Sequence, residues 1–398
     1  MTTTTQIAII EEKTKRNYAG SMNRILMILV IALGVFVLHA GRSFIIPFVV
    51  ALAIFFILTI FEDLISRGIK KIISLFRKKE FSHRLNIAVG VASFVLSLSV
   101  SACMLFFFYK TITSNFNDML SNTTKYQMLF NGKIAQFNNA VRGSQNAEYA
   151  ANLTPFQQII AIIPEAHLPI IDHKIIEKIN INYFINKIGS FAGKGIANSV
   201  LVLVYLLFLY LERRNFRRKI EKITALNPKF TRAQKTINEI SSDLVKYFTI
   251  KAVVSAITGI ICYFVMSFFK LDFAWLWAFI IFVLNFIPTI GSIVATILPS
   301  LLGLIVFDSI IDAVILAFLI TAIQFSIGNV IEPKYQGDRL NLSPLMILLS
   351  LAVWGAIWGV VGMFLAVPIM VTINATLAQF ETTKPLAMFF STNGEIKD

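Results

Sequence analysis

The chain has 398 residues, of which 56% are hydrophobic and 15% are charged, and its formal net charge is +14. A soluble globular protein is closer to half apolar and a quarter charged. Several runs here reach the roughly 20 apolar residues that cross a bilayer. The composition therefore excludes an ordinary soluble domain and predicts an all-α polytopic membrane protein with about eight membrane segments, two of them interrupted.

The position of the basic residues accounts for the positive charge. More than half of the 36 lie before the first apolar run and in alternate loops: Lys13, Lys15, Arg16, Arg24; Arg67, Lys70, Lys71, Arg77, Lys78, Lys79, Arg84; Arg213, Arg214, Arg217, Arg218, Lys219, Lys222, Lys229, Arg232, Lys235 and Lys246. Because Lys and Arg gather in cytoplasmic loops, we expect a cytoplasmic N-terminus. Anionic lipid headgroups are a sufficient partner for these clusters, and nucleic acid is not expected.

The sequence carries no pattern typical of an enzyme or a metalloprotein. Both cysteines lie in apolar runs, and His167 and His173 have poor spacing for one helix face. Asp308 and Asp312 share a helix face but lack the Gly-Xaa-Gly-Asp pattern of an intramembrane protease. A G-x-x-x-x-G-K-[ST] loop is also missing, so the chain itself does not power transport with ATP. We expect no cofactor, no metal and no enzymatic activity.

The first half contains four predicted spans around an external domain. The spans cover residues 25–39, 44–61, 87–109 and 196–211, and the short link 40–43 predicts a tight hairpin between the first two. Residues 110–191 are polar, with apolar residues at helical spacing, which predicts a small extracytoplasmic helical domain. The predicted units are a cytoplasmic head with three spans (1–109), this domain (110–191), the fourth span with a basic cytoplasmic segment (192–247) and a transport core (248–398).

Two apolar segments of the transport core are too long for one span and are interrupted. After a span over 248–269, the segments 275–306 and 343–376 flank a continuous helix over 312–330. Each long segment is either one kinked crossing or a re-entrant hairpin. Residues 332–341 lie outside in the first case and inside in the second, and the C-terminus is cytoplasmic in both. Hairpins are favoured, because Pro288 and Gly291 fall near the middle of the first segment.

Polar side chains occur where these segments are interrupted. The candidate solute or ion pathway consists of Asn285, Pro288, Gly291, Ser292, Gln324, Asn329 and Glu332. Proline removes a backbone donor and glycine allows close approach, so a freed carbonyl with Asn and Ser oxygens suits a small polar solute or Na+. The alternative is a packing kink, in which Asn285 bonds a neighbouring helix.

Glu332 is the acidic member of this set. An acidic residue at membrane depth is by default a functional-site hypothesis, here as a carrier of a coupling proton or Na+. We expect Asn329 and Glu332, three residues apart, to share a helix face. The alternative is an interfacial carboxylate paired with Lys334 or Arg339, since Pro333 places Glu332 at a helix end.

Proline and glycine also mark candidate hinges or gates. These are Pro333, Gly337, Pro344, Gly359, Gly362 and Pro368. Trp354 and Trp358 lie beside the glycines, and close helix packing is the favoured alternative for this region.

Four motifs resemble the autoinducer-2 exporter family of bacterial permeases. They are N-F-I-P-T-I-G-S at 285–292, N-V-I-E-P-K-Y-Q-G-D-R-L-N-L-S-P-L at 329–345, G-V-V-G-M-F-L-A-V-P at 359–368 and T-T-K-P-L-A at 382–387. The resemblance implies a permease of the bacterial inner membrane that forms a homo-oligomer, with a pentamer as one form. It does not fix the substrate, because the family is named for the quorum-sensing molecule autoinducer-2 while other members are described as sodium/proton antiporters.

The leading hypothesis is a secondary transporter that exports a small polar solute, with autoinducer-2 or a similar signalling molecule as first candidate. A monovalent cation (Na+)/proton antiporter that uses the same residues is the main alternative. A passive channel and a non-transporting scaffold that docks partners through residues 110–191 are the remaining ones.

Overall fold

The computed structural model of the chain describes residues 26, 29–30, 32–76, 83–143, 199–226, 230–336 and 340–396, and helix is the regular structure found in these ranges. The helices are α2 (Arg42–Phe76), α3 (His83–Ser121), α4 (Thr123–Gly143), α8 (Ser199–Leu226), α9 (Phe230–Phe268), α10 (Ala274–Leu284), α11 (Ile290–Val306), α12 (Ile310–Ser326), the π-helical turn η3 (Ile327–Ile331), α13 (Glu332–Gln336), α14 (Pro344–Trp358), α15 (Val360–Leu377) and α16 (Lys384–Phe390). The predicted all-α class is confirmed. Beyond residue 143, the predicted external domain lies outside the described residues, as do His167 and His173.

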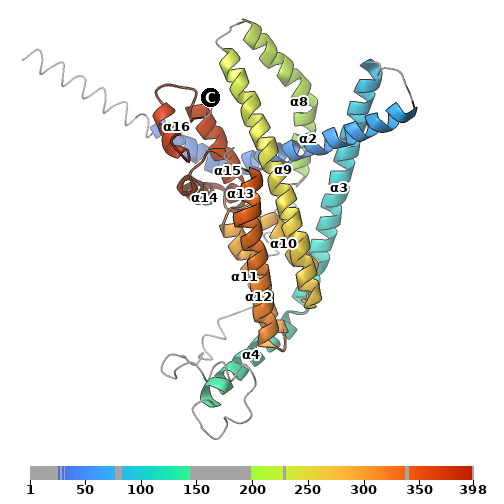
Figure 1. Cartoon of the computed structure of the whole chain (residues 1–398), viewed down its shortest axis with the longest axis vertical. Helices are drawn as coiled ribbons and strands as arrows, with labels where there is room; N and C mark the ends of the chain where they lie inside the picture. Colours follow the sequence, from blue (N-terminus) through green and yellow to red (C-terminus); the bar gives the residue numbers. More distant parts are fainter. Residues whose placement is uncertain are drawn as a thin grey trace, which may run out of the picture.

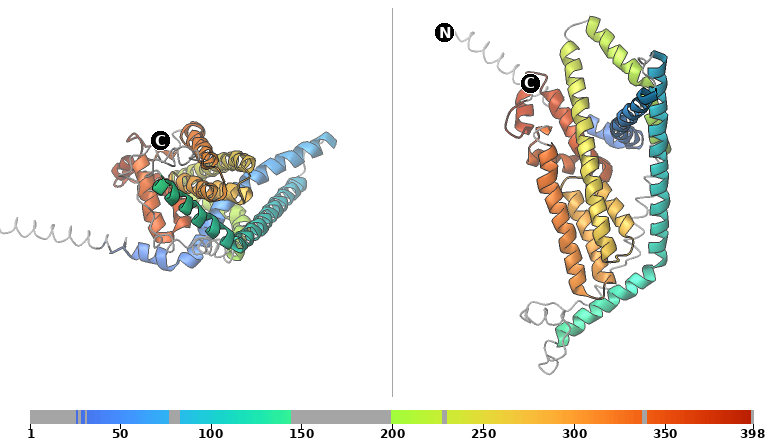
Figure 2. Two further views of the ribbon diagram at one scale, coloured as in Figure 1. Left: turned by 90° about the horizontal axis from the view of Figure 1, so that it is seen from below. Right: turned by 45° about the vertical axis from the view of Figure 1, so that its right-hand side comes forward.

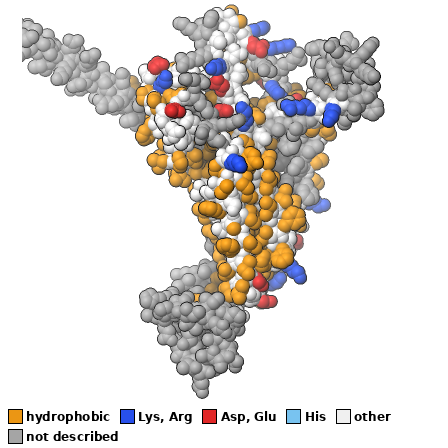
Figure 3. Space-filling view, viewed as in Figure 1, with side chains coloured by type: hydrophobic (Ala, Val, Ile, Leu, Met, Phe, Trp, Pro, Cys, Tyr) orange, Lys and Arg blue, Asp and Glu red, His pale blue; other side chains and the backbone are white. Residues whose placement is uncertain are grey.

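The length and composition of the helices fit a polytopic membrane protein. Within the described ranges, four segments are long and apolar enough to cross a bilayer: Arg42–Thr59, Ala233–Phe268, Ile310–Gln336 and Val360–Leu377. Figure 3 shows hydrophobic side chains over the middle of the molecule, with charged side chains gathered toward its two ends. This distribution matches an apolar belt in lipid between two polar surfaces.

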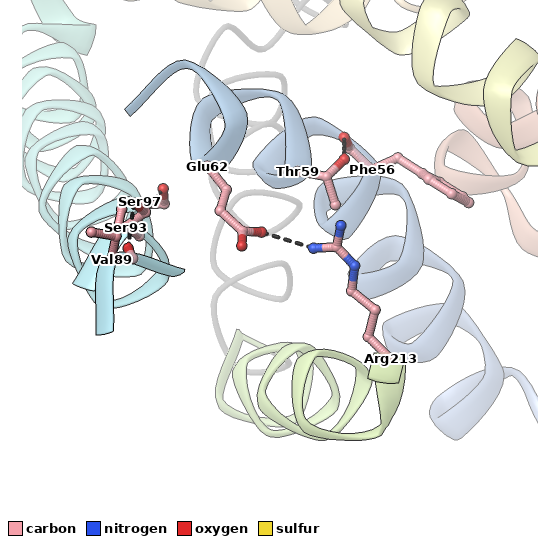
Figure 4. Close-up of polar contacts among 7 residues, drawn as sticks. All are labelled: Phe56, Thr59, Glu62, Val89, Ser93, Ser97 and Arg213. Atoms are coloured by element: carbon pink, nitrogen blue, oxygen red, sulfur yellow. Dashed lines mark hydrogen bonds and ion pairs between the residues drawn. The ribbon is translucent and has the colours of Figure 1, made fainter. Parts of the chain in front are cut away.

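The long helices α9 and α12 run side by side along the molecule (Figures 1 and 2). α2 crosses them at a steep angle and packs on α3, α8 and α9. Figure 4 shows an ion pair at the α2–α8 contact, where the Arg213 guanidinium donates to the Glu62 carboxylate at 2.9 Å. On α3, the hydroxyls of Ser93 and Ser97 donate to carbonyls one turn earlier, which satisfies both groups inside the helix.

The tight hairpin expected at residues 40–43 is wrong. Residues 32–40 are helical and α2 begins at Arg42. Across the junction, the Gly41 N–H donates to the Val37 carbonyl and the Ile45 N–H donates to the Gly41 carbonyl. Because these i to i−4 bonds continue the helical pattern, the chain bends at Gly41 and does not reverse (Figure 1).

The first long apolar segment folds back on itself as a hairpin of α10 and α11, here called the first hairpin. The rings of Phe269 and Phe307, which flank its two ends, have centroids 6.2 Å apart. A single kinked crossing would hold these ends a membrane thickness apart. The structure therefore has the hairpin that the positions of Pro288 and Gly291 favoured.

The second long segment forms the second hairpin, α14 and α15. Its arms are joined by a hydrogen bond from the Ser350 hydroxyl to the Ala366 carbonyl at 2.9 Å. At its open end, the Asn374 amide donates to the Asn341 carbonyl at 3.5 Å. At its tip, the Trp358 indole N–H donates to the Leu38 carbonyl at 3.0 Å, which ties the reversal to the N-terminal helical segment.

The two hairpins open toward opposite ends of the molecule and meet between them. The first opens beside α4, and the second opens beside α16 (Figure 1). The Phe286 ring at the tip of the first stacks on Phe364 of the second with centroids 4.8 Å apart. Ile287 packs with Leu351 and Ala366 in the same contact. The tip of the first hairpin is thus held against the second.

The helix α4 covers the open end of the first hairpin. The Tyr126 hydroxyl donates to the Asp272 carboxylate at 2.9 Å, and the Lys125 ammonium lies 3.9 Å from the same carboxylate. Lys133 donates to the Asp308 carbonyl at 3.1 Å. Burial of the side chain, the larger cause, and the hydrogen bond to Asp272 raise the pKa of Tyr126 above its usual value. α4 therefore joins the loops that precede and follow the first hairpin.

Candidate functional site

One face of α9 carries a row of buried polar side chains. Tyr247, Lys251, Ser255 and Thr258 follow one another at intervals of three or four residues, which places them on one helix face. Their exposed fractions are 4%, 3%, 0% and 0%. Polar groups buried inside a membrane helix are costly unless they meet partners in the protein, so this face marks where the bundle interior is polar.

Lys251 pairs with Glu332. Its ammonium nitrogen lies 2.5 Å from the Glu332 Oε1, with side-chain exposures of 4% and 13%. The bond joins α9 to the start of α13, 81 residues later in the chain. The partner that the structure shows is Lys251 and not Lys334, which the interfacial alternative named and which is exposed. Arg339, the other partner named there, lies outside the described residues.

A π-helical turn directly before Glu332 sets its direction. The Glu332 N–H donates to the Ile327 carbonyl, five residues earlier instead of four. Asn329 is exposed, and its amide donates to the Phe325 carbonyl at 3.2 Å. The expectation that Asn329 and Glu332 share a face is therefore wrong, because the wider turn rotates them apart. Pi turns of this kind are frequent at functional sites.

Asn285 joins three segments at the tip of the first hairpin. Its exposed fraction is 3%. Its amide nitrogen donates to the Ser255 hydroxyl of α9 at 3.2 Å, and its carbonyl oxygen accepts from the Ser292 hydroxyl of α11 at 3.3 Å. The structure thus brings together Asn285 and Ser292, as predicted, and adds Ser255. The bond to α9 is also the neighbouring-helix contact that the packing alternative foresaw.

Four buried polar side-chain atoms have no partner within the described part of the chain. Two of them, the Tyr247 hydroxyl and the Gln324 amide nitrogen, lie on α9 and α12; the other two are the Trp277 indole nitrogen and the Asn374 side-chain oxygen. Gln324 is 6% exposed and lies on α12, eight residues before Glu332. Leaving such a group unpaired costs about 1–3 kcal/mol. A ligand that supplied the missing bonds would recover that energy.

These groups form what we call the polar column: Tyr247, Lys251, Ser255, Thr258, Asn285, Ser292, Gln324 and Glu332. At 1.5 Å per residue, Asn285 is about 16 Å along α10 from the open end of the first hairpin, near half the ~30 Å hydrocarbon core. Lys251 is about 26 Å from the end of α9 on the same scale. The column therefore extends from the tip of the first hairpin toward the end of the molecule that carries α13 and α16.

The other half of the same interior is apolar. Buried Met266, Trp277, Ile281, Leu316 and Ile320 pack together between α9, α10 and α12. This apolar cluster lies between the tip of the first hairpin and α4. The column is thus closed at one end by close-packed hydrophobic side chains.

The predicted pathway and hinge residues at the reversals have structural roles. An added Cβ at Gly291 would overlap the Leu284 carbonyl, and one at Gly362 would overlap the Trp354 carbonyl. Pro288 lies at the first tip. The carbonyl four residues before it, that of Leu284, accepts from the Ile287 N–H at 2.9 Å, so the carbonyl that the missing proline N–H was expected to free has a partner. Gly359 forms the second tip with φ of 65°.

The remaining hinge candidates lie in or beside helices. Pro333 is the second residue of α13, and Pro344 is the first residue of α14, after the Ser343 cap. Pro368 is buried inside α15. Gly337 lies outside the described residues. In the described ranges, His, Cys, Asp and Glu form no group of three or more that could hold a metal ion.

A family profile described as AI-2E family transporter matches residues 25–382. The chain belongs to the AI-2E transporter family. A protein of Borreliella burgdorferi, provisionally named a transport protein, is 35% identical over 224 residues, 55% of this chain and 62% of that protein. A similarly named protein of Haemophilus influenzae is 27% identical over 74% of this chain and 78% of its own length.

Escherichia coli K12 contributes a relative with a named substrate. It is the AI-2 transport protein TqsA, 32% identical over 48% of this chain and 54% of TqsA. The chain thus spans only 62% of the Borreliella protein's length and little more than half of TqsA's. The family and the names of these relatives associate this chain with membrane transport.

Sequence reasoning missed Lys251, the counter-ion of the predicted Glu332. A signal was present, because Lys251 stands inside the apolar run predicted as the fifth span. An ionisable residue within such a run is a functional-site hypothesis in its own right. The partner could not be read from the sequence, since it lies 81 residues away on another helix.

Proposed function

We propose that this chain is a secondary transporter that exports a small polar solute, autoinducer-2 or a chemically similar molecule, by way of the polar column. The observation that carries the proposal is the Lys251–Glu332 pair, one turn along α9 from the unpaired Tyr247 hydroxyl, with a further unpaired group, the Gln324 amide, on α12. Donors and acceptors inside a membrane protein suit a solute rich in hydroxyl groups. Membership of the AI-2E family and the similarity to TqsA support this substrate class.

The interrupted helices support a transport role for the same region. Transporters commonly place their sites near the bilayer midplane, at helices that are broken there. The tip of the first hairpin is such a break, and Asn285 at the tip belongs to the polar column. In this proposal Asn285, Ser292 and Gln324 contact the solute, and Glu332 carries the coupling proton.

The proposed setting is the inner membrane of a bacterial cell, with both termini in the cytoplasm. The basic clusters of the sequence support this orientation, since Lys and Arg gather on the cytoplasmic side. The proposed assembly is a homo-oligomer, with a pentamer as the form to test by native mass spectrometry of the detergent-solubilised protein.

The deciding experiment is uptake of labelled autoinducer-2 into inverted vesicles, with and without an imposed proton gradient. We expect accumulation that depends on the gradient and is lost in Glu332→Gln. The matched control is Asp312→Asn, an exposed carboxylate of α12 outside the polar column, which should transport like the unaltered chain. Membrane insertion of each variant is checked by protein recovered in the membrane fraction.

Two results would reject this proposal. Coupled accumulation that is unchanged in Glu332→Gln would remove Glu332 from the mechanism. Absence of accumulation in an inserted, folded chain would remove autoinducer-2, and sodium-triggered proton flux in the same vesicles would then identify a cation/proton antiporter.

A further inference from the structure

We propose that Lys251 is a tethered cation: its ammonium group fills the position beside Glu332 that an exchangeable Na+ or K+ would otherwise occupy. The inference deepens the proposed transport function and rests on it. If it holds, the solute moves independently of the Na+ and K+ gradients.

The contact itself is the first argument. The ammonium lies 2.5 Å from the Glu332 Oε1, within direct hydrogen-bonding distance. The Lys251 side chain is 4% exposed and that of Glu332 is 13% exposed, so solvent contributes little to neutralising the carboxylate. A buried carboxylate needs a positive partner or a proton, because an isolated buried charge is strongly destabilising. Lys251 supplies that partner from within the chain.

The second argument is that the Lys251 ammonium excludes a metal cation from the Glu332 carboxylate. A metal cation bound to the same carboxylate would lie within a few ångströms of the ammonium, and like charges at that separation repel strongly where water is scarce. The adjacent unpaired atom is the Tyr247 hydroxyl, one turn earlier on α9. One hydroxyl adds a single neutral oxygen, which does not offset that repulsion. The pair therefore disfavours metal-cation binding while Lys251 is present.

The third argument concerns the coupling of solute movement to a cation gradient. An exchangeable cation can enter from one side and leave on the other, so its gradient can drive a solute. An ammonium on a lysine side chain neutralises the same carboxylate but cannot leave α9. A carrier built this way retains the charge balance of a cation-binding transporter without the dependence on an external metal cation. This consequence separates a tethered cation from a site that requires Na+.

Thermal unfolding of the purified full-length chain tests the inference without any solute. The melting temperature Tm is measured in NaCl, KCl and choline chloride at equal ionic strength. We expect the unaltered chain to have the same Tm in all three salts. In Lys251→Ala, which frees the carboxylate and vacates the ammonium position, we expect a lower Tm in choline and a saturable rise with Na+.

Two control variants isolate the site. Lys246→Ala removes an exposed lysine of the same helix and should not acquire a response to Na+. Lys251→Ala combined with Glu332→Gln removes the carboxylate as well and should abolish the acquired response. The first control excludes a general effect of losing a lysine, and the second assigns the response to Glu332.

A saturable Na+ response in the unaltered chain that Glu332→Gln abolishes would overturn the inference. A folded Lys251→Ala chain with the same Tm in all three salts would also overturn it and leave the pair as a structural contact. Should Lys251→Ala fail to fold, the solute assay decides: accumulation driven by an imposed Na+ gradient refutes the inference, and equal accumulation in sodium and choline supports it. The unfolding test stands even where no autoinducer-2 is transported, so the two proposals can fail separately.

Discussion

The two hairpins have the same architecture and different chemistry. Each reverses where a glycine lies against a backbone carbonyl, Gly291 against Leu284 and Gly362 against Trp354. The first carries a buried amide at its tip that bonds α9 and α11, whereas the tip of the second is tied by a tryptophan to the N-terminal helical segment. The comparison teaches that the broken helix alone does not define a site. The polar side chains at the break of the first hairpin are what make it the candidate site.

The largest expected effect is the loss of stability when the glycine at the reversal of either hairpin is replaced. Gly291→Val and Gly362→Val should each destabilise the fold by about 4 kcal/mol or more, because a side chain there overlaps a backbone carbonyl that cannot move aside. Yield in the membrane fraction and Tm in detergent measure the effect. Gly328→Ala is the control, since open space surrounds Gly328 and the loss should be small. Wild-type Tm in either valine variant would refute the packing of that hairpin.

The next effect should separate the hairpins. Asn285→Leu removes the bonds to Ser255 and Ser292, leaves the buried Ser255 hydroxyl without that partner, and should abolish transport with a stability loss of about 1–3 kcal/mol. Ser350→Ala removes the bond between the arms of the second hairpin and should lower stability by about 1 kcal/mol while transport persists. Vesicle uptake and Tm are measured together. Equal transport losses at equal stability would mean that both hairpins act alike.

The smallest expected effect is a pH-dependent change in stability when Tyr126 of α4 is replaced. Burial and Asp272 raise the pKa of Tyr126 above its ordinary value of 10.0, so the folded state favours the neutral phenol. The stability it contributes is present below pH 10 and is lost as pH rises toward the raised value. Tyr126→Phe should cost about 0.5–1.5 kcal/mol at neutral pH and show a shallower fall of Tm above pH 10. Parallel slopes in both chains would contradict the assignment.

Much of the fold could be predicted because helix breaks leave local signals. Pro288 and Gly291 marked the first reversal, and Gly359 and Gly362 marked the second. The choice between a kink and a hairpin depended on contacts such as Phe269 with Phe307, which join distant residues and leave no local pattern. The bend at Gly41 was missed for a related reason, since a short polar link allows either a reversal or a continued helix.

The site was predicted in part. Asn285, Ser292, Gln324 and Glu332 came from polar residues in apolar runs; the structure joins Asn285 with Ser292, joins Glu332 with Lys251, and leaves the buried Gln324 amide nitrogen without a partner in the described residues. Asn329 was assigned to the same face by ordinary helical spacing, which fails across a π turn. Lys251 was overlooked although its position inside a span was visible.

The extra residue in the π turn also determines how the helix that follows it is rotated about its axis, and so where its side chains point. An α-helix advances about 100° per residue, so one added residue turns the following helix by that angle about its axis. Deleting Gly328 would restore the ordinary phase and swing Glu332 away from α9 without altering a single charge. The direction in which the Glu332 carboxylate points, and hence its contact with Lys251, thus depends on the number of residues in one helical turn.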